Sequence, residues 1–167
     1  MPQFRAAQRK IKSLSVLVRI VRQAKSKGRR VVLTNGCFDL VHAGHVALLE
    51  RAKRLGDLLV VAINSDRSVR TVKGPQRPIM DQQDRALLVG ALESVDYVTI
   101  FNEATPEGLV RCLHPHVLVK GADWGPGNIV GSDIVRQDGG RVVRIPLVQG
   151  YSTTQLIKRI RTVRDVR

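Results

Sequence analysis

The sequence lacks any long uncharged apolar stretch. The longest such run, Leu58–Ile63, has six residues, whereas a helix that spans a bilayer needs about 20. Cysteine is also scarce, because Cys37 and Cys112 are the only two. This excludes a disulfide framework and favours reduced thiols in a cytoplasmic protein. We therefore expect a globular protein with a cytoplasmic location and no membrane partner.

Acidic residues are missing from residues 1–30, which contain ten Lys or Arg residues. Residues 157–167 add five basic residues against Asp165, and residues 31–156 are balanced, so the net charge of +14 belongs to the two ends. No helix-turn-helix, zinc-ligand spacing or aromatic RNA-binding signature accompanies that charge, and only 4% of the residues are aromatic. We therefore expect no nucleic-acid partner.

An acid-free, Arg-rich N-terminus is also typical of transit peptides. In this one, however, apolar residues recur at helical spacing, and Gly28 can end the helix. These apolar residues are Leu14, Leu17, Val18, Val21 and Ala24. We therefore interpret residues 1–30 as a basic N-terminal extension with a lead-in helix that packs on the domain.

Past Arg30, short runs rich in Val and Ile alternate with segments of helical spacing. The expected strands are 31–35, 58–63, 97–101, 117–119 and 142–145. The expected helices are 44–55, 81–94, 106–113, 128–137 and 153–163. This alternation predicts an α/β, Rossmann-like parallel sheet with helices on both faces, in a single domain over residues 31–167. In the last helix we expect Leu156, Ile157 and Ile160 to form the buried stripe.

The segment after the first expected strand, residues 36–45, reads GCFDLVHAGH. Neither the GxGxxG nor the P-loop pattern occurs in the chain, so a phosphate site has to be built differently. Gly44 and His45 open a helix, whose free N–H groups and positive dipole end attract an anion. His42 and His45 could donate hydrogen bonds to phosphate oxygens. The alternative for HxGH taken alone is a pair of surface histidines near a tight turn.

A second block, residues 150–154, reads GYSTT and leads into the last expected helix. Hydroxyl residues before a helix are most often caps, but a cap needs only one of them. In a parallel sheet, ligands bind beyond the carboxyl ends of the strands. Both blocks follow strands at that edge, so one pocket could hold a triphosphate between two helix N-termini.

The first block resembles the opening signature of the HxGH nucleotidyltransferase superfamily, in which the second block holds the nucleotide's β- and γ-phosphates. Several further blocks narrow the resemblance. They are NSD at 64–66, VKGPQRPI at 72–79, DR at 84–85, ALESVDY at 91–97 and LVKGADW at 118–124. Together, over about residues 11–161, these blocks are similar to the cytidylyltransferase-like adenylyltransferases of ADP-heptose synthesis.

The resemblance implies an enzyme that transfers AMP from ATP to D-glycero-β-D-manno-heptose 1-phosphate and releases pyrophosphate. Such a reaction serves the synthesis of lipopolysaccharide core or other heptose glycoconjugates. The resemblance also implies Mg²⁺, bound mainly through the substrate phosphates. Because no sugar-kinase domain precedes the motifs in this sequence, we expect a separate heptose kinase to supply the 1-phosphate. We also expect a homodimer.

Residue roles follow from the same resemblance. His42, His45 and Lys73 are the implied catalytic residues, with Lys73 carried on a mobile loop. The implied nucleotide-binding residues are Cys37, Phe38, His42, Gly44, His45, Lys120, Asp123, Trp124, Gly150, Ser152, Thr153 and Thr154. The implied substrate-binding residues are Asp39, Asn64, Asp66, Lys73 and Arg77.

Some of these residues have a second interpretation. Asp39 could accept sugar hydroxyls or brace its turn, and Asn64 and Asp66 could cap a turn. Trp124 could instead pack against other side chains. Arg85 has no role in this set, and its place within an expected helix suits a structural ion pair or a dimer contact. The alternative function is a cytidylyltransferase that acts on glycerol 3-phosphate or a similar small phosphate ester.

Overall fold

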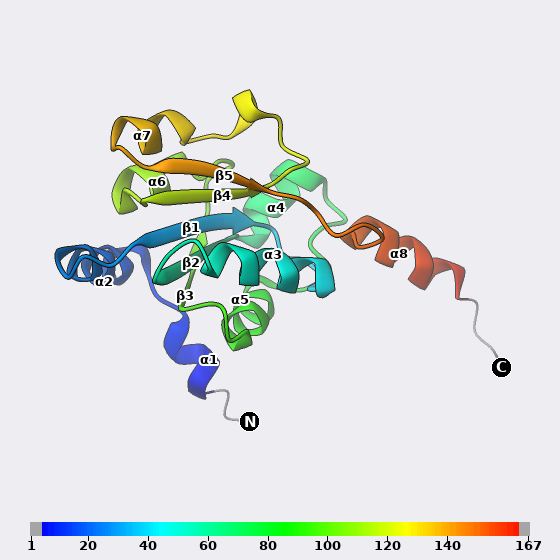
Figure 1. Cartoon of the computed structure of the whole chain (residues 1–167). Helices are drawn as coiled ribbons and strands as arrows, with labels where there is room; N and C mark the ends of the chain where they lie inside the picture. Colours follow the sequence, from blue (N-terminus) through cyan, green and yellow to red (C-terminus); the bar gives the residue numbers. More distant parts are fainter. Residues whose placement is uncertain (1–4, 164–167) are drawn as a thin grey trace.

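The computed structural model describes residues 5–163 and contains one parallel sheet, with strand order β3-β2-β1-β4-β5 (Figure 1). The strands are β1 Val31–Gly36, β2 Leu58–Asn64, β3 Tyr97–Phe101, β4 Val117–Gly121 and β5 Arg141–Ile145. The chain runs outward from β1 to β3 and then crosses back to β4 and β5. This confirms the predicted α/β, Rossmann-like class. The outer ends of the two predicted units, residues 1–4 and 164–167, lie outside the described residues.

The sheet is buried between two apolar layers, because successive strand residues point to opposite faces. On one face, Leu33 and Val60 pack with helices α2, α6 and α7. On the other face, Val32 and Val61 pack with α3 and α5. All seven residues of β2 are buried, as expected of a strand covered on both sides.

The helices follow the expected alternation, with two additions. Their bounds are α1 Arg5–Lys10, α2 Leu14–Ser26, α3 Ala43–Lys53, α4 Asp66–Lys73, α5 Gln82–Ala91, α6 Glu107–Leu113, α7 Ser132–Gln137 and α8 Thr153–Thr162, with a 3₁₀ turn at Pro126–Asn128. The helix expected at 128–137 is shorter, because Gly131 has φ 86° and α7 begins after it. Within residues 5–163, none of the helices has the length and apolarity to cross a membrane.

Helices α1 and α4 were not expected. Ser65 caps α4 by accepting a hydrogen bond from the Ser68 amide. Lys73 is therefore the last residue of a helix, and its expected place on a mobile loop is wrong. The sequence did not predict α4, because only Val69 and Val72 in this helix are apolar and they give no clear helical pattern.

The lead-in helix is α2, and its apolar stripe packs into the core. Leu17 and Val21 are 0% and 1% exposed and belong to the same cluster as Leu33 of β1. The adjacent helix α1 also contacts the domain, because Lys10 Nζ donates a hydrogen bond to the Leu92 carbonyl at 2.9 Å. The basic N-terminal segment therefore contributes directly to the folded core.

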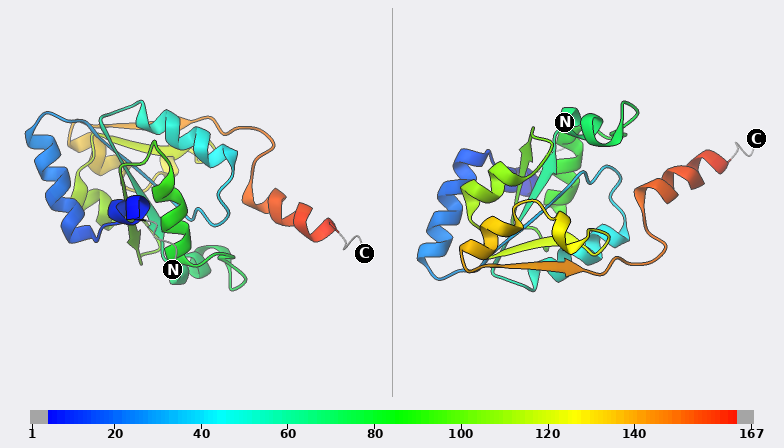
Figure 2. Two further views of the ribbon diagram at one scale, coloured as in Figure 1. Left: turned by 90° about the horizontal axis from the view of Figure 1, so that it is seen from below. Right: turned by 90° about the horizontal axis from the view of Figure 1, so that it is seen from above.

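Helix α8 contradicts the expected burial. It projects away from the sheet (Figures 1 and 2) and buries none of its residues. Leu156 and Ile160 are 36% and 58% exposed, so the predicted buried stripe of Leu156, Ile157 and Ile160 is wrong. An amphipathic pattern places apolar residues on one side of a helix, but it does not supply a surface that covers them.

Replacement of Leu17 by Ala should lower the free energy of unfolding by about 3 kcal/mol, because it leaves a cavity between α2 and the sheet. Urea denaturation measures the loss. The control is Leu88→Ala in α5, where the side chain is 42% exposed and the expected change is within about 0.5 kcal/mol. Equal, small losses in both variants would show that α2 is not part of the core.

Candidate active site at the carboxyl end of the sheet

A pocket of about 690 Å³ lies beyond the carboxyl ends of β1 and β4. These strands are neighbours at the point where the strand order reverses, which is where ligands bind in open α/β sheets. Fifteen predicted site residues line the pocket. They are Cys37, Phe38, Asp39, His42, Gly44, His45, Asn64, Lys73, Arg77, Lys120, Asp123, Trp124, Ser152, Thr153 and Thr154. Two predicted residues, Asp66 and Gly150, lie outside it.

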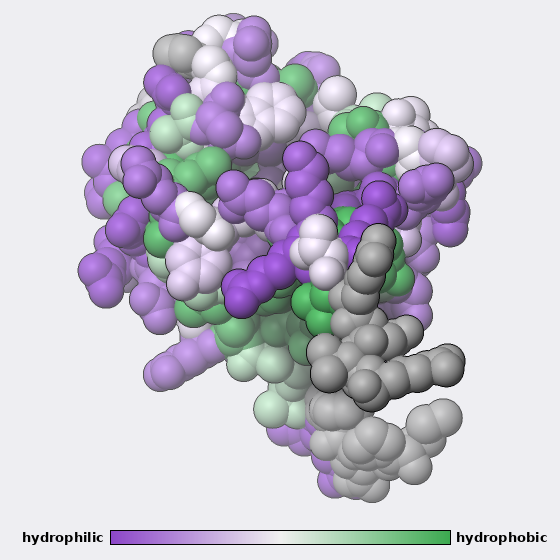
Figure 3. All heavy atoms as spheres, turned by 90° about the vertical axis from the view of Figure 1, so that its right-hand side faces the viewer, coloured by the Kyte–Doolittle hydropathy of each residue, from purple (hydrophilic) through white to green (hydrophobic). Residues whose placement is uncertain are grey.

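Gly150 lies beside a smaller cavity of about 140 Å³, which shares His42, Tyr151 and Ser152 with the main pocket. Gly150 adopts φ 81°, a conformation that favours glycine, and this turns the chain into α8. Figure 3 views the side of the molecule from which α8 projects. Hydrophilic side chains dominate the upper part of this side, and apolar side chains gather below them.

His42 and His45 stack on one another at the start of α3. Their ring centroids are 3.8 Å apart with an interplanar angle of 19°. The His42 amide donates a hydrogen bond to His45 Nδ1 at 3.4 Å. A Cβ at Gly44 would lie 3.0 Å from Tyr151 Cβ and 3.1 Å from the His42 ring, so a glycine here allows the start of α3 and the Tyr151 segment to approach closely.

Burial favours the neutral form of both imidazoles. Burial, and then the charge of His42, lowers the pKa of His45 to about 4. Burial also lowers the pKa of His42. Because His45 Nδ1 accepts a hydrogen bond, the neutral ring carries its proton on Nε2 and can donate it to an anion. The positive potential around the rings therefore comes from the N-terminus of α3 and from neighbouring lysines.

Lys120 and Trp124 form the wall on the β4 side. Lys120 is 7% exposed, and its Nζ lies 5.0 Å from the Trp124 ring centroid, within range of a cation–π interaction. Burial lowers the pKa of Lys120 to about 8, while Cys37 and Asp123 act in the opposite direction. Trp124 is 45% exposed, so its ring lines the pocket instead of packing in the core.

The carboxylate of Asp39 braces the polypeptide by contacting the segment that contains residues 77–80. Its Oδ1 accepts hydrogen bonds from the amides of Ile79 and Met80, at 2.7 and 3.1 Å. Its Oδ2 lies 2.6 Å from Arg77 Nε, an ion pair without hydrogen-bond alignment. The Asp39 side chain is only 1% exposed. Of the two interpretations, the structure therefore shows the brace.

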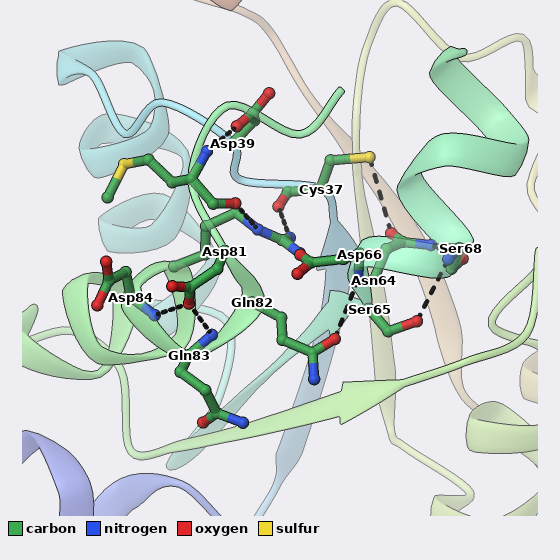
Figure 4. Close-up of polar contacts among 12 residues, drawn as sticks. Cys37, Asp39, Asn64, Ser65, Asp66, Ser68, Asp81, Gln82, Gln83 and Asp84 are labelled. Carbon is green, nitrogen blue, oxygen red and sulfur yellow. Dashed lines mark hydrogen bonds and ion pairs between the residues drawn. The ribbon is translucent and has the colours of Figure 1, made fainter. Parts of the chain in front are cut away.

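Asp66 faces away from the pocket. Its carboxylate accepts a hydrogen bond from Arg85 Nη2 at 2.8 Å, and its amide donates to Gln82 Oε1. The predicted substrate-binding role of Asp66 does not fit this position, because α4 begins there and its first residue meets α5. Asn64 lines the pocket and donates to Ser68 Oγ at 2.9 Å. Figure 4 shows these contacts.

The hydroxyl residues of the second block, Ser152, Thr153 and Thr154, have two roles. Ser152 caps α8, since its Oγ accepts from the Gln155 amide at 3.1 Å. Its hydroxyl proton remains a potential donor, and Thr153 and Thr154 line the pocket beside it.

Cys37 also lines the pocket. Burial raises the pKa of its thiol, and this makes a thiolate nucleophile unfavourable.

Sequence reasoning missed several lining residues, including Asn35, Thr105, Pro106, Leu147 and Tyr151. A usable signal existed for Thr105 and Pro106. They follow β3, whose carboxyl end lies at the same edge of the sheet as that of β1. Leu147 follows β5 in the same way.

The chain provides few ligands for a metal ion. Within residues 5–163, no group of three or more His, Cys, Asp or Glu side chains is arranged to hold one. The pocket contains the carboxylates of Asp39 and Asp123, and Asp39 already has its partners. These residues do not fit a metal cage made of protein ligands alone, so we derive no step through a bound ion.

The lowered pKa of His45 predicts a pH-dependent stability. Between the ordinary pKa of about 6.5 and the folded value of about 4, the unfolded chain binds a proton that the folded chain does not. Stability should therefore fall as the pH is lowered through this range. His45→Gln should lose less unfolding free energy between pH 7 and pH 4.5 than the parent, as measured by urea denaturation. The same loss in both proteins would contradict the burial of a neutral His45.

Comparisons with known proteins agree with the geometry. Residues 33–159 match the family model described as Cytidylyltransferase-like. The chain is 51% identical to the Bifunctional protein HldE of Trichlorobacter lovleyi over 158 residues, which cover 95% of this chain and 32% of that protein. It is 54% identical to the Bifunctional protein HldE of Gluconobacter oxydans over 140 residues, which cover 84% and 29%. The chain thus spans about a third of the length of these curated relatives.

A solved structure shows the same arrangement. The lipopolysaccharide core biosynthesis protein of Thermoplasma volcanium aligns with a TM-score of 0.61 and 27% identity, over 75% of this chain and all of that one. The family match begins within β1, before the HxGH segment, and ends within α8, after the hydroxyl block. Since it covers both motif blocks and the pocket between them, the chain belongs to the cytidylyltransferase-like family.

Proposed function

We propose that this chain is a sugar-phosphate adenylyltransferase, which transfers AMP from ATP to D-glycero-β-D-manno-heptose 1-phosphate. The observation that carries the proposal is that one pocket is lined by residues of the HxGH segment, the Lys120–Trp124 segment and the hydroxyl residues 152–154. The similarity to HldE proteins and to a lipopolysaccharide core biosynthesis protein supports it. The product ADP-heptose would serve lipopolysaccharide core or other heptose glycoconjugate synthesis.

The proposed step is a direct displacement. An oxygen of the sugar phosphate forms a bond to the α-phosphorus of ATP, and the bond from that phosphorus to the pyrophosphate oxygen breaks. The attacking phosphate is already anionic, so the reaction needs no strong base. The protein contributes by orienting the two substrates and by stabilising the charge that develops on the triphosphate.

Each side of the pocket has a part in this proposal. His42, His45 and the amides at the start of α3 would donate to the α-phosphate and the departing oxygen. Thr153 and Thr154 would hold the pyrophosphate end, and Lys120 with Trp124 would face the nucleoside. The sugar phosphate would lie near Lys73 and Arg77. Magnesium would enter with the triphosphate, where it neutralises phosphate charge.

Two partners are part of the proposal. A kinase activity must supply the heptose 1-phosphate, whether from a separate protein or from another part of a longer one. A second copy of the chain would form the homodimer.

The experiment that tests the function measures pyrophosphate release from the chain with Mg²⁺, heptose 1-β-phosphate and either ATP or CTP. Release with ATP alone is the expected result. Release with CTP alone would contradict the choice of base and favour the cytidylyltransferase alternative. No release with either nucleotide would contradict the choice of sugar.

A matched pair of histidine variants links that release to the pocket. His45→Ala should lower kcat by about 10²–10³-fold, as expected when one transition-state donor is lost. The control is His114→Ala, because His114 lies at the end of α6, outside the pocket, where it pairs with Asp138. Equal rates in the two variants would remove His45 from the mechanism.

A further inference from the structure

Arg85 is the largest of the fully buried side chains, with 0% exposure. A buried guanidinium is costly unless its N–H groups are paired. Arg85 satisfies this requirement with three acceptors from three segments. Its Nε donates to the Met80 carbonyl at 3.0 Å, its Nη1 donates to the Cys37 carbonyl, and its Nη2 pairs with Asp66 Oδ1 at 2.8 Å.

Two of these acceptors are backbone carbonyls, and one of them belongs to Cys37, which lines the pocket. Cys37 belongs to the segment between β1 and α3, one residue before Phe38, whose φ is 48°. Met80 ends the segment that carries Arg77 beside the pocket. Cys37 and Asp39 come from the β1–α3 segment and Asp66 from the start of α4, and Figure 4 shows them around the same group of polar contacts.

The peptide groups of Met80 are held from two sides. Its amide donates to Asp39 Oδ1 at 3.1 Å, and its carbonyl accepts from Arg85. Asp39 lies on the same β1–α3 segment as Cys37. Arg85 and Asp39 therefore form a double tie between that segment and residues 77–80.

We infer that Arg85 is a positioning residue for the sugar-phosphate side of the pocket, which it sets by fixing residues 77–80 against the β1–α3 segment. The inference rests on the proposed function. Arg85 does not line the pocket and touches no substrate in this scheme. Its planar fork spans acceptors in three segments, a geometry that the single ammonium group of lysine cannot reproduce.

The test compares Arg85→Lys with Leu17→Ala in the full chain. Leu17 lies in the core cluster formed by α2, so its replacement lowers stability without touching the pocket. Arg85→Lys should raise the KM for heptose 1-phosphate by about tenfold, because small misplacements at a reacting centre are expensive. The KM for ATP should change less. Leu17→Ala should leave both KM values unchanged, so equal KM values in the two variants would overturn the positioning role.

Hydrogen exchange tests the tie without relying on any activity. The amides of Ile79 and Met80, which donate to Asp39, should exchange about tenfold faster in Arg85→Lys. Amides of β2 should keep their parental rates. Unchanged exchange at Ile79 and Met80 would overturn the inference, even if the parent proves inactive toward heptose 1-phosphate. That inactivity by itself would count against the proposed function only.

A second variant covers the case in which Arg85→Lys does not fold. Asp66→Asn removes the negative charge that Arg85 pairs with but keeps the shape of the side chain. It should raise the KM for heptose 1-phosphate and the exchange rate at Met80 in the same direction, by smaller factors. Parental values for both would overturn the inference.

Discussion

The pairing of β1 with β4 decides where the polar chemistry of this domain lies. The register places Thr34 against Val119, and Thr34 Oγ1 donates to the Val119 carbonyl at 3.1 Å. One residue beyond, Lys120 Nζ lies 3.4 Å from the Asn35 carbonyl. Segments about 85 positions apart in the chain therefore end at one place, where two parallel strands diverge and leave a pocket between them.

Electrostatics within this pocket follow from burial more than from formal charge. Burial is the main cause of the lowered pKa values of the stacked histidines, and it favours their neutral forms. The N-terminus of α3 and Lys120 supply the positive potential instead. The excess basic charge of the chain lies entirely at its two ends. The net charge of +14 thus describes the ends and says little about the site.

The sequence predicted the sheet and most of its helices, because buried parallel strands and amphipathic helices leave regular apolar patterns. It missed α4, whose eight residues contain only two apolar side chains. It also predicted a buried apolar stripe for α8 and a substrate-binding role for Asp66, and neither fits the structure. Both depend on which residues the folded chain brings opposite to them. The Cys37 carbonyl and Arg85 are 48 positions apart in the sequence, and no local sequence pattern predicts a contact over that separation. Most predicted pocket residues lie together because each follows a strand end, but their individual roles remain predictions.

In the proposed reaction, one pocket joins ATP and a sugar phosphate in a single displacement. Exchange of ³²P-labelled pyrophosphate into ATP tests it most directly, with Mg²⁺ present and heptose 1-phosphate added or omitted. Label should enter ATP only when heptose 1-phosphate is present, because only then can AMP be transferred and returned. Label entering ATP without the sugar phosphate would reveal an adenylyl-enzyme intermediate and contradict a direct displacement.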